Sequence, residues 1–145
     1  MRWIAVCLLL VLAGCGVGTG PGASQVKLEA FVELGSAPRP AGLKSAELGT
    51  AEGQEFQRIL EGAKVAKPDE VRAALSFAPP SDRRAFAFVM PGCAEDGAEM
   101  TIERDTLRAE LTGGENVNCA TANYFLTVFS VDRDSIPAAP TLMPR

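Results

Sequence analysis

The sequence predicts an α+β domain in which an antiparallel sheet carries one or two short helices and is tied by one disulfide. Three observations favour this class. Most segments after residue 84 have the apolar patterns of β-strands, residues 50–62 have helical spacing, and Cys93 and Cys119 lie within the candidate domain. A small β-sandwich is the alternative fold.

The amino-terminal half contains one predicted strand and one predicted helix. Residues 26–34 (VKLEAFVEL) alternate apolar and charged positions, except at Phe31, which indicates a half-buried strand. Residues 35–42 form a turn or loop. The predicted helix at 50–62 begins with Thr50 as its cap and has one apolar face, formed by Phe56, Ile59, Leu60 and Ala63.

Residues 67–80 allow two readings. Asp69 can cap a short helix that runs through Leu75, or residues 71–78 can form a strand that ends at Pro79 and Pro80. Both alternatives remain open at this point.

The carboxyl-terminal half indicates β-structure. Residues 84–90 (RAFAFVM) alternate large and small apolar side chains, which is typical of a strand covered on both faces. Residues 99–103 and 106–111 predict a hairpin in which Ile102 faces Leu107 and Met100 faces Ala109. Residues 112–118 form a polar loop, residues 123–131 a central strand, and residues 138–145 an exposed, proline-rich tail.

The amino terminus has the pattern of an export signal. Arg2 precedes the apolar run 4–12, which is shorter than the roughly 20 residues that span a bilayer. The run ends in Leu12-Ala13-Gly14-Cys15, which resembles the lipobox of bacterial lipoprotein signal peptides. The resemblance implies cleavage before Cys15 and a diacylglycerol, with fatty acids such as palmitate, on its thiol. An ordinary cleaved signal or a retained anchor are the alternatives.

The resulting organisation has four parts: a signal peptide at 1–14, a lipidated glycine-rich tether at 15–25, one α+β domain at 26–137, and the tail at 138–145. Two acyl chains, at about 0.8 kcal/mol per buried CH2, suffice for stable anchoring. Cys7 lies in the signal and Cys15 takes the lipid, so Cys93 and Cys119 are expected to form a disulfide in the exported chain. Its loop closure contributes on the order of 3.5 kcal/mol.

A second resemblance covers the carboxyl-terminal third. The hairpin followed by YFLTVFSVDRDSIP is similar to the end of small exported domains in protease-complex subunits and related bacterial lipoproteins. The likeness lies in strand spacing, and those domains typically lack the cysteine pair. It implies no functional residue in this chain.

Composition restricts the chemistry. The chain has no histidine and a net charge of −4, which argues against the usual zinc sites, histidine-based catalysis and nucleic-acid binding. An acidic segment could serve a hydrolase or bind calcium if its carboxylates converged with a raised pKa; its members are Glu95, Asp96, Glu99, Glu103 and Asp105. A solvated hairpin edge is the preferred interpretation, and Arg83 and Arg84 are likewise expected in solvent. We also expect Phe86, Phe88, Tyr124, Phe125 and Phe129 to form core, with a ligand pocket as the alternative.

These observations predict a membrane-anchored bacterial lipoprotein with a non-catalytic, extracytoplasmic binding domain for a protein or a small ligand. We expect no cofactor, no metal ion and no nucleic acid, with the membrane and a protein of the cell envelope as partners. The location is the cell membrane, or the outer membrane if the source is a diderm. A carboxylate-dependent hydrolase and a structural envelope protein are the alternative functions.

Overall fold

The computed structural model describes residues 25–37, 39–114 and 117–145. The predicted signal peptide, Cys15 and all but the last residue of the predicted tether lie outside the described residues. The strands are β1 (Val26–Gly35), β2 (Ala46–Glu47), β3 (Arg83–Gly92), β4 (Gly97–Glu103), β5 (Thr106–Thr112), β6 (Asn123–Asp132) and β7 (Thr141–Pro144). The helices are α1 (Ala51–Glu61), α2 (Pro68–Leu75) and a 3-10 turn at Arg133–Ser135.

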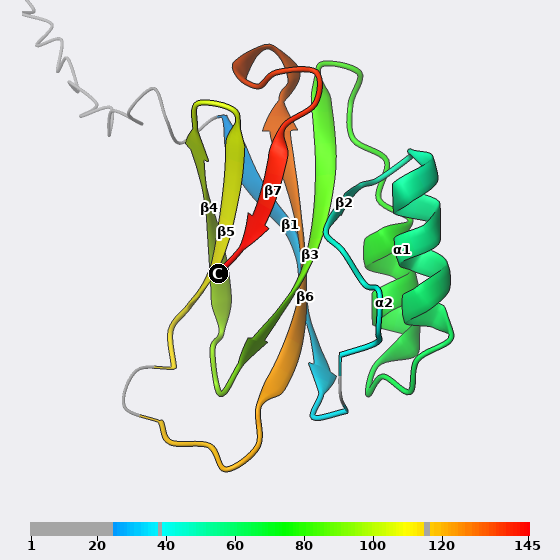
Figure 1. Cartoon of the computed structure of the whole chain (residues 1–145), viewed down its shortest axis with the longest axis vertical. Helices are drawn as coiled ribbons and strands as arrows, with labels where there is room; N and C mark the ends of the chain where they lie inside the picture. Colours follow the sequence, from blue (N-terminus) through cyan, green and yellow to red (C-terminus); the bar gives the residue numbers. More distant parts are fainter. Residues whose placement is uncertain (1–24, 38, 115–116) are drawn as a thin grey trace, which may run out of the picture.

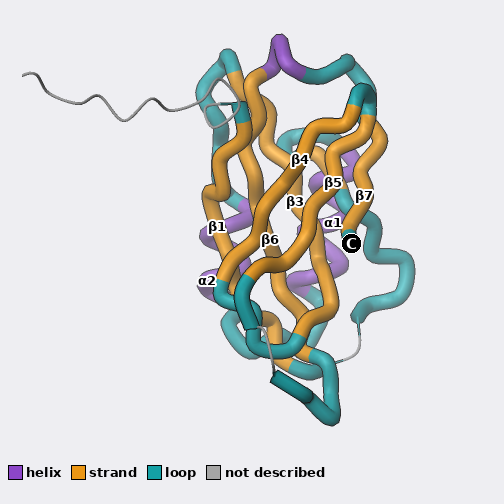
Figure 2. The backbone as a smooth tube through the Cα atoms, turned by 90° about the vertical axis from the view of Figure 1, so that its left-hand side faces the viewer, coloured by secondary structure: helices purple, strands orange, loops and turns teal. Residues whose placement is uncertain are grey.

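The elements form three layers (Figure 1). A four-stranded sheet in the order β1-β6-β3-β2 lies in the middle, with α1 and α2 on one face. A three-stranded sheet in the order β4-β5-β7 covers the other face, as the view turned by 90° also shows (Figure 2). The predicted α+β class is confirmed. The face-to-face sheets of the sandwich alternative are present too, but the helices make a third layer.

The central strands of the middle sheet, β3 and β6, are buried on both faces, because the helices cover one face and the second sheet covers the other. On β3, the smaller Ala85, Ala87 and Val89 face the helices, whereas the larger side chains, namely Phe86, Phe88 and Met90, face the second sheet. Small side chains on the helix side let the helices approach the sheet closely, and large ones fill the space between the sheets. The covered strand predicted at 84–90 and the central strand predicted at 123–131 are both confirmed.

The helices bury apolar faces against the middle sheet. Phe56 and Leu60 of α1 and Val71 and Leu75 of α2 belong to the same core cluster. Residues 67–80, for which the sequence allows either a helix or a strand, contain α2, so the helical alternative is right. Its predicted cap is wrong: Asp69 lies inside the first turn, because the helix begins at Pro68, whose missing N–H costs nothing at that position.

The hairpin has the predicted register, with Ile102 opposite Leu107 and Met100 opposite Ala109. Its apolar side packs on the core between the sheets, where Phe88 and Phe129 meet edge to face at 6.1 Å. The strand predicted at 26–34 is also present as β1.

The carboxyl terminus differs from the sequence prediction. The tail expected at 138–145 contains β7, which pairs in parallel with β5 and places Leu142 beside Leu107 in the core between the sheets. The N–H of Thr141 donates to Asp105 O at 2.7 Å and that of Arg145 donates to Ala109 O at 2.9 Å. Thr141 and Arg145 direct their amide groups toward β5, so the backbone nitrogen of Pro144 points away from β5. The N–H that proline lacks is therefore not needed for strand pairing. Among the described residues, no helix has the length and apolar character needed to cross a membrane.

Candidate functional site

A short strand edge organises the candidate site. β2 is one of the two edge strands of the middle sheet and pairs with β3, with Ala46 opposite Ala87. Just after β2, the N–H of Leu48 donates to Ala85 O at 2.8 Å. In an antiparallel pair, alternate residues direct their amide groups to opposite sides. Because residues 46 and 48 bond to β3, Ser45 and Glu47 direct their amide groups away from the sheet.

β2 is held tightly against the start of α1. The carbonyl of Glu47 accepts a hydrogen bond from the Thr50 hydroxyl at 2.8 Å, and that hydroxyl accepts one from the Gly53 N–H at 3.1 Å. A Cβ on Gly53 would collide with the Glu47 carbonyl oxygen and lie 3.1 Å from the Cα of Leu48. The predicted cap Thr50 is confirmed, and the glycine allows the close approach of helix to strand.

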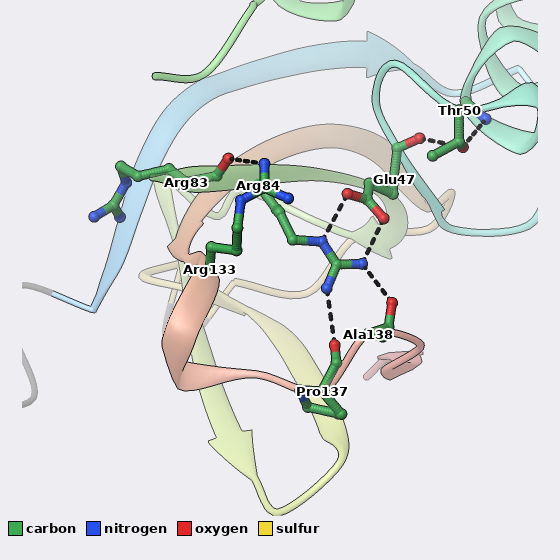
Figure 3. A network of polar contacts seen from close by, with 8 residues as sticks. Glu47, Thr50, Arg83, Arg84, Arg133, Pro137 and Ala138 are labelled. Atoms are coloured by element: carbon green, nitrogen blue, oxygen red, sulfur yellow. Dashed lines mark hydrogen bonds and ion pairs between the residues drawn. The ribbon is translucent and has the colours of Figure 1, made fainter. Parts of the chain in front are cut away.

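A buried arginine fastens β2 to the carboxyl-terminal segment (Figure 3). Arg84 donates from Nε and Nη2 to the Glu47 carboxylate at 2.7 and 2.6 Å, and from Nη1 and Nη2 to the carbonyls of Pro137 and Ala138 at 2.8 and 2.9 Å. Its side chain is 8% exposed and lies 5.2 Å from the centre of the Phe86 ring. The hydrogen bonds to Glu47 raise the pKa of Arg84. The expectation that Arg84 lies in solvent is wrong, because this pairing compensates its burial.

Cavities lie on both sides of the β2 edge. On the helix side, a cavity of about 400 Å³ lies between residues 44–46 and α1, where Phe56 and Ile59 form its apolar wall. On the side of the second sheet, cavities of about 340 and 480 Å³ lie between residues 43–47 and the carboxyl-terminal segment, including Pro140 and Leu142. We call the three together the β2 groove.

Ser45 lies at the centre of the β2 groove, because it lines all three cavities. Its Oγ is buried and has no hydrogen-bond partner within the described residues. A buried hydroxyl without a partner destabilises the fold, and rotation of the Ser45 side chain toward a ligand would give this hydroxyl a partner.

Charged side chains line both sides of the β2 groove, and Glu52 also lines one cavity on the side of the second sheet. Glu52 and Glu55 of α1 line the helix-side cavity, and Arg39 and Lys44 line the cavity beside β7. Lys44 also reaches the rim of the helix-side cavity. Arg39 donates to the carbonyl of Leu43 at 2.6 Å, which fixes this cation at the groove.

The carboxylates singled out in the sequence lie elsewhere, and none of the five lines the β2 groove. Glu103 pairs with Arg108 at 3.1 Å, and this hydrogen bond lowers its pKa, which is opposite to what a general acid needs. Glu95 accepts from the Cys93 N–H, and Glu99 is exposed opposite Glu110. Within the described ranges, no three potential ligand side chains gather in a group that could hold a metal ion.

The predicted disulfide between Cys93 and Cys119 is present, with a Cα–Cα distance of 5.7 Å. It joins the end of β3 to the loop before β6. Four of the five aromatic residues expected in the core are buried, namely Phe86, Phe88, Phe125 and Phe129, and Tyr124 packs partly buried against the core between the middle sheet and the helices. Phe86 also lines one cavity of the β2 groove, so one member of the set has the alternative role as well.

The residues that build the β2 groove were not found from the sequence. A strand of two residues shows no periodicity, and Ser45 stands in no motif. The one available signal was the close sequence Glu47–Gly53, in which a cap residue and a glycine at the start of a helix indicate a tight corner. Comparisons with family models, with curated proteins and with solved structures give no match.

Proposed function

We propose that this chain is a lipid-anchored bacterial lipoprotein whose extracytoplasmic domain binds a ligand, without catalysis, in the β2 groove. The observation that carries the proposal is the convergence of three cavities on one strand edge, where the Ser45 hydroxyl is buried without a partner. Ligand sites are usually concave and mainly apolar, with a few polar groups that fix orientation.

The rigidity around the β2 groove supports a binding role. Arg84, Glu47 and Thr50 join β3, β2, α1 and the carboxyl-terminal segment through hydrogen bonds of 2.6–3.1 Å. A pre-formed site loses little conformational entropy when it binds its ligand.

The anchor is supported by the sequence Leu12-Ala13-Gly14-Cys15 and by the glycine-rich residues that follow it. A lipid on Cys15 concentrates the domain at the outer side of a membrane, and a glycine-rich tether lets it reach partners there. The cell membrane, or the outer membrane of a diderm, is the location that we propose.

Two experiments test this function separately. Intact mass of the protein isolated from membranes should show cleavage before Cys15 and an added diacylglycerol, and Cys15→Ser should release the protein from the membrane fraction. An unlipidated mass would contradict the anchor.

The binding site is tested with a Ser45→Trp variant, which fills the β2 groove, and with Thr101→Trp as a control on the exposed face of the hairpin. A panel of short peptides and small organic molecules is screened by thermal shift against both variants and the unmodified chain. Ligands that stabilise the chain and the Thr101→Trp variant, but not Ser45→Trp, support the proposal. Ligands that bind all three equally, or a panel without any ligand, would contradict it.

A further inference from the structure

We infer that the ligand of the β2 groove is an extended peptide segment, which pairs with the outer edge of β2 as an additional strand of the middle sheet. The inference rests on the proposed function and specifies the chemical class of its ligand.

The backbone of β2 offers the hydrogen-bonding groups that such a segment needs. Ser45 and Glu47 direct their amide groups outward, since Ala46 and Leu48 bond to β3. The Glu47 carbonyl is taken by Thr50, which leaves the N–H and carbonyl of Ser45 and the N–H of Glu47 on the open side. An incoming strand satisfies these groups through its own main chain, which is the basis of recognition by strand addition.

The positions of the cavities match the geometry of a strand. Side chains of an added strand point alternately to the two faces of the sheet. One face of the β2 edge has the cavity of about 400 Å³ beside α1, and the other has those of about 340 and 480 Å³ beside the carboxyl-terminal segment. Side chains of a strand added at this edge can therefore enter cavities on both faces of the sheet.

The charges of the two sides predict a sequence preference. Glu52 favours basic side chains, together with apolar ones, at positions that face α1, whereas the charge of Glu55 is already paired with Arg58 at 2.5 Å. Arg39 and Lys44 favour acidic or apolar side chains at positions that face β7. Among the described residues, Glu52 and Lys44 form no ion pair with each other or with another residue, and each lines cavities on both sides of the β2 edge.

The other edge of the middle sheet is built differently. β1 has irregularities in its register between Leu28 and Ala30 and between Glu33 and Gly35, and it carries the charged residues Lys27 and Glu29. Bulges and charged side chains are devices that prevent an edge from pairing with another strand. β2 is short, but it has neither a bulge nor a proline, and its one charged side chain, Glu47, is engaged by Arg84.

The probes are short acetylated and amidated peptides that alternate basic and apolar residues on one face with acidic and apolar residues on the other. Two control sets keep the same composition. In one, the order is scrambled so that the faces are mixed; in the other, alternate backbone nitrogens carry a methyl group and cannot donate hydrogen bonds. Binding is measured by calorimetric titration to the chain as isolated from the producing cell.

We expect the alternating peptides to bind, and N-methylation on the face that pairs with β2 to weaken binding by about tenfold or more. Ser45→Pro removes one outward N–H without removing a bond to β3, so it should weaken binding about tenfold, whereas Ser45→Ala keeps that N–H and loses only the hydroxyl, so it should weaken binding less than Ser45→Pro does. Glu52→Lys should reduce affinity for peptides with lysine facing α1 and restore it for the matching glutamate peptides.

A direct measurement does not depend on these variants folding. Hydrogen exchange of the Ser45 and Glu47 amides in the unmodified chain should slow when the peptide is added, while Ala46, already bonded to β3, should change little. Equal affinity of the N-methylated and unmethylated peptides, or unchanged exchange at residues 45 and 47 with bound peptide, would overturn the inference. If small molecules but no peptides bind in the groove, the inference fails and the proposed function stands; if neither binds, both fail.

Discussion

Arg84 and Glu47 are joined by two parallel hydrogen bonds, at 2.7 and 2.6 Å, between the central strand β3 and the edge strand β2. The arginine side chain is 8% exposed and the glutamate side chain 25%. Since the same guanidinium also donates to the carbonyls of Pro137 and Ala138, this pair holds both walls of one cavity of the β2 groove in place.

Loss of this pairing should destabilise the fold. Glu47→Gln removes the charge that compensates the buried guanidinium, and we expect the free energy of unfolding to fall by about 1.5–3 kcal/mol. Urea denaturation measures the change. Glu103→Gln is the matched control, because it removes a similar pair with the more exposed Arg108, and it should change stability little. Equal effects of the two substitutions would contradict the role of burial.

Gly53 should not tolerate a side chain, although alanine is the better helix former. A Cβ there meets the carbonyl oxygen of Glu47, so Gly53→Ala must displace α1 from β2 and should cost about 1–3 kcal/mol. Gly62→Ala, at the end of the same helix, places its Cβ no closer than 3.5 Å to another atom and should be neutral or slightly stabilising. Thermal unfolding of both variants checks the difference. If Gly53→Ala is as stable as the unmodified chain, then α1 can move away from β2 without a loss of stability.

β7 should contribute to the core although it lies in a proline-rich segment. Leu142→Ala removes a partly buried side chain that packs between the sheets, and we expect a loss of about 1–2 kcal/mol in unfolding free energy. The neighbouring Met143 points to the other side and is 39% exposed, so Met143→Ala should cost less than about 0.5 kcal/mol. If both substitutions are neutral in urea denaturation, β7 does not stabilise the domain.

Glu29 should make stability depend on pH in the acid range. Burial raises its pKa, but hydrogen bonds from Ser130 at 2.7 Å and Lys27 at 3.0 Å, with the charges of Lys27 and Arg83, lower it below the ordinary value of 4.5. A lowered pKa in the folded state stabilises the fold above the unfolded value, and this contribution is lost as the pH falls through the folded value.

Glu29→Gln should therefore flatten the decline of stability below pH 4.5, and Ser130→Ala should flatten it in part. Urea denaturation at a series of pH values gives the two slopes. A slope that Glu29→Gln leaves unchanged would assign the acid sensitivity to other groups.

The disulfide should stabilise the domain without determining its fold. Reduction, or replacement of both Cys93 and Cys119 by alanine, opens a covalent loop around the β4–β5 hairpin and should cost about 3.5 kcal/mol by loop-closure entropy. β3 and β6 are already paired up to Gly92 and Asn123, so circular dichroism of the reduced protein should keep its strand signal in the absence of denaturant. A reduced protein that unfolds completely would show that strand pairing alone is too weak.

The longer strands and the first helix were predictable because the order of apolar and polar residues within each segment indicates its secondary structure. The alternation in 84–90 shows a strand buried on both faces, and the opposed apolar residues of the hairpin define its register, with Met100 opposite Ala109. The helix at 50–62 has both a cap and an apolar face. The disulfide is predictable because Cys7 and Cys15 lie in the amino-terminal segment that resembles a lipoprotein signal, which leaves one pair of cysteines in the domain.

The β2 groove was not predictable, because its parts come from segments that are far apart in the chain and individually lack a pattern. Ser45 and Glu47 became edge residues only when β3 paired with Ala46, and Leu142 became a core residue only when β7 lay beside β5. The two-residue β2 and the proline-flanked β7 have weak local preferences, so tertiary contacts decided their conformation.

Local periodicity and composition were sufficient to predict the α+β class, the central strands, the hairpin register and the cysteine pair. The burial of Arg84, the completion of the second sheet by the carboxyl-terminal segment, and the cavities along the outer edge of β2 arise from contacts between distant segments. Burial, strand pairing and the shape of a cavity depend on which distant surfaces of the chain meet. The residues of one short segment do not determine those contacts.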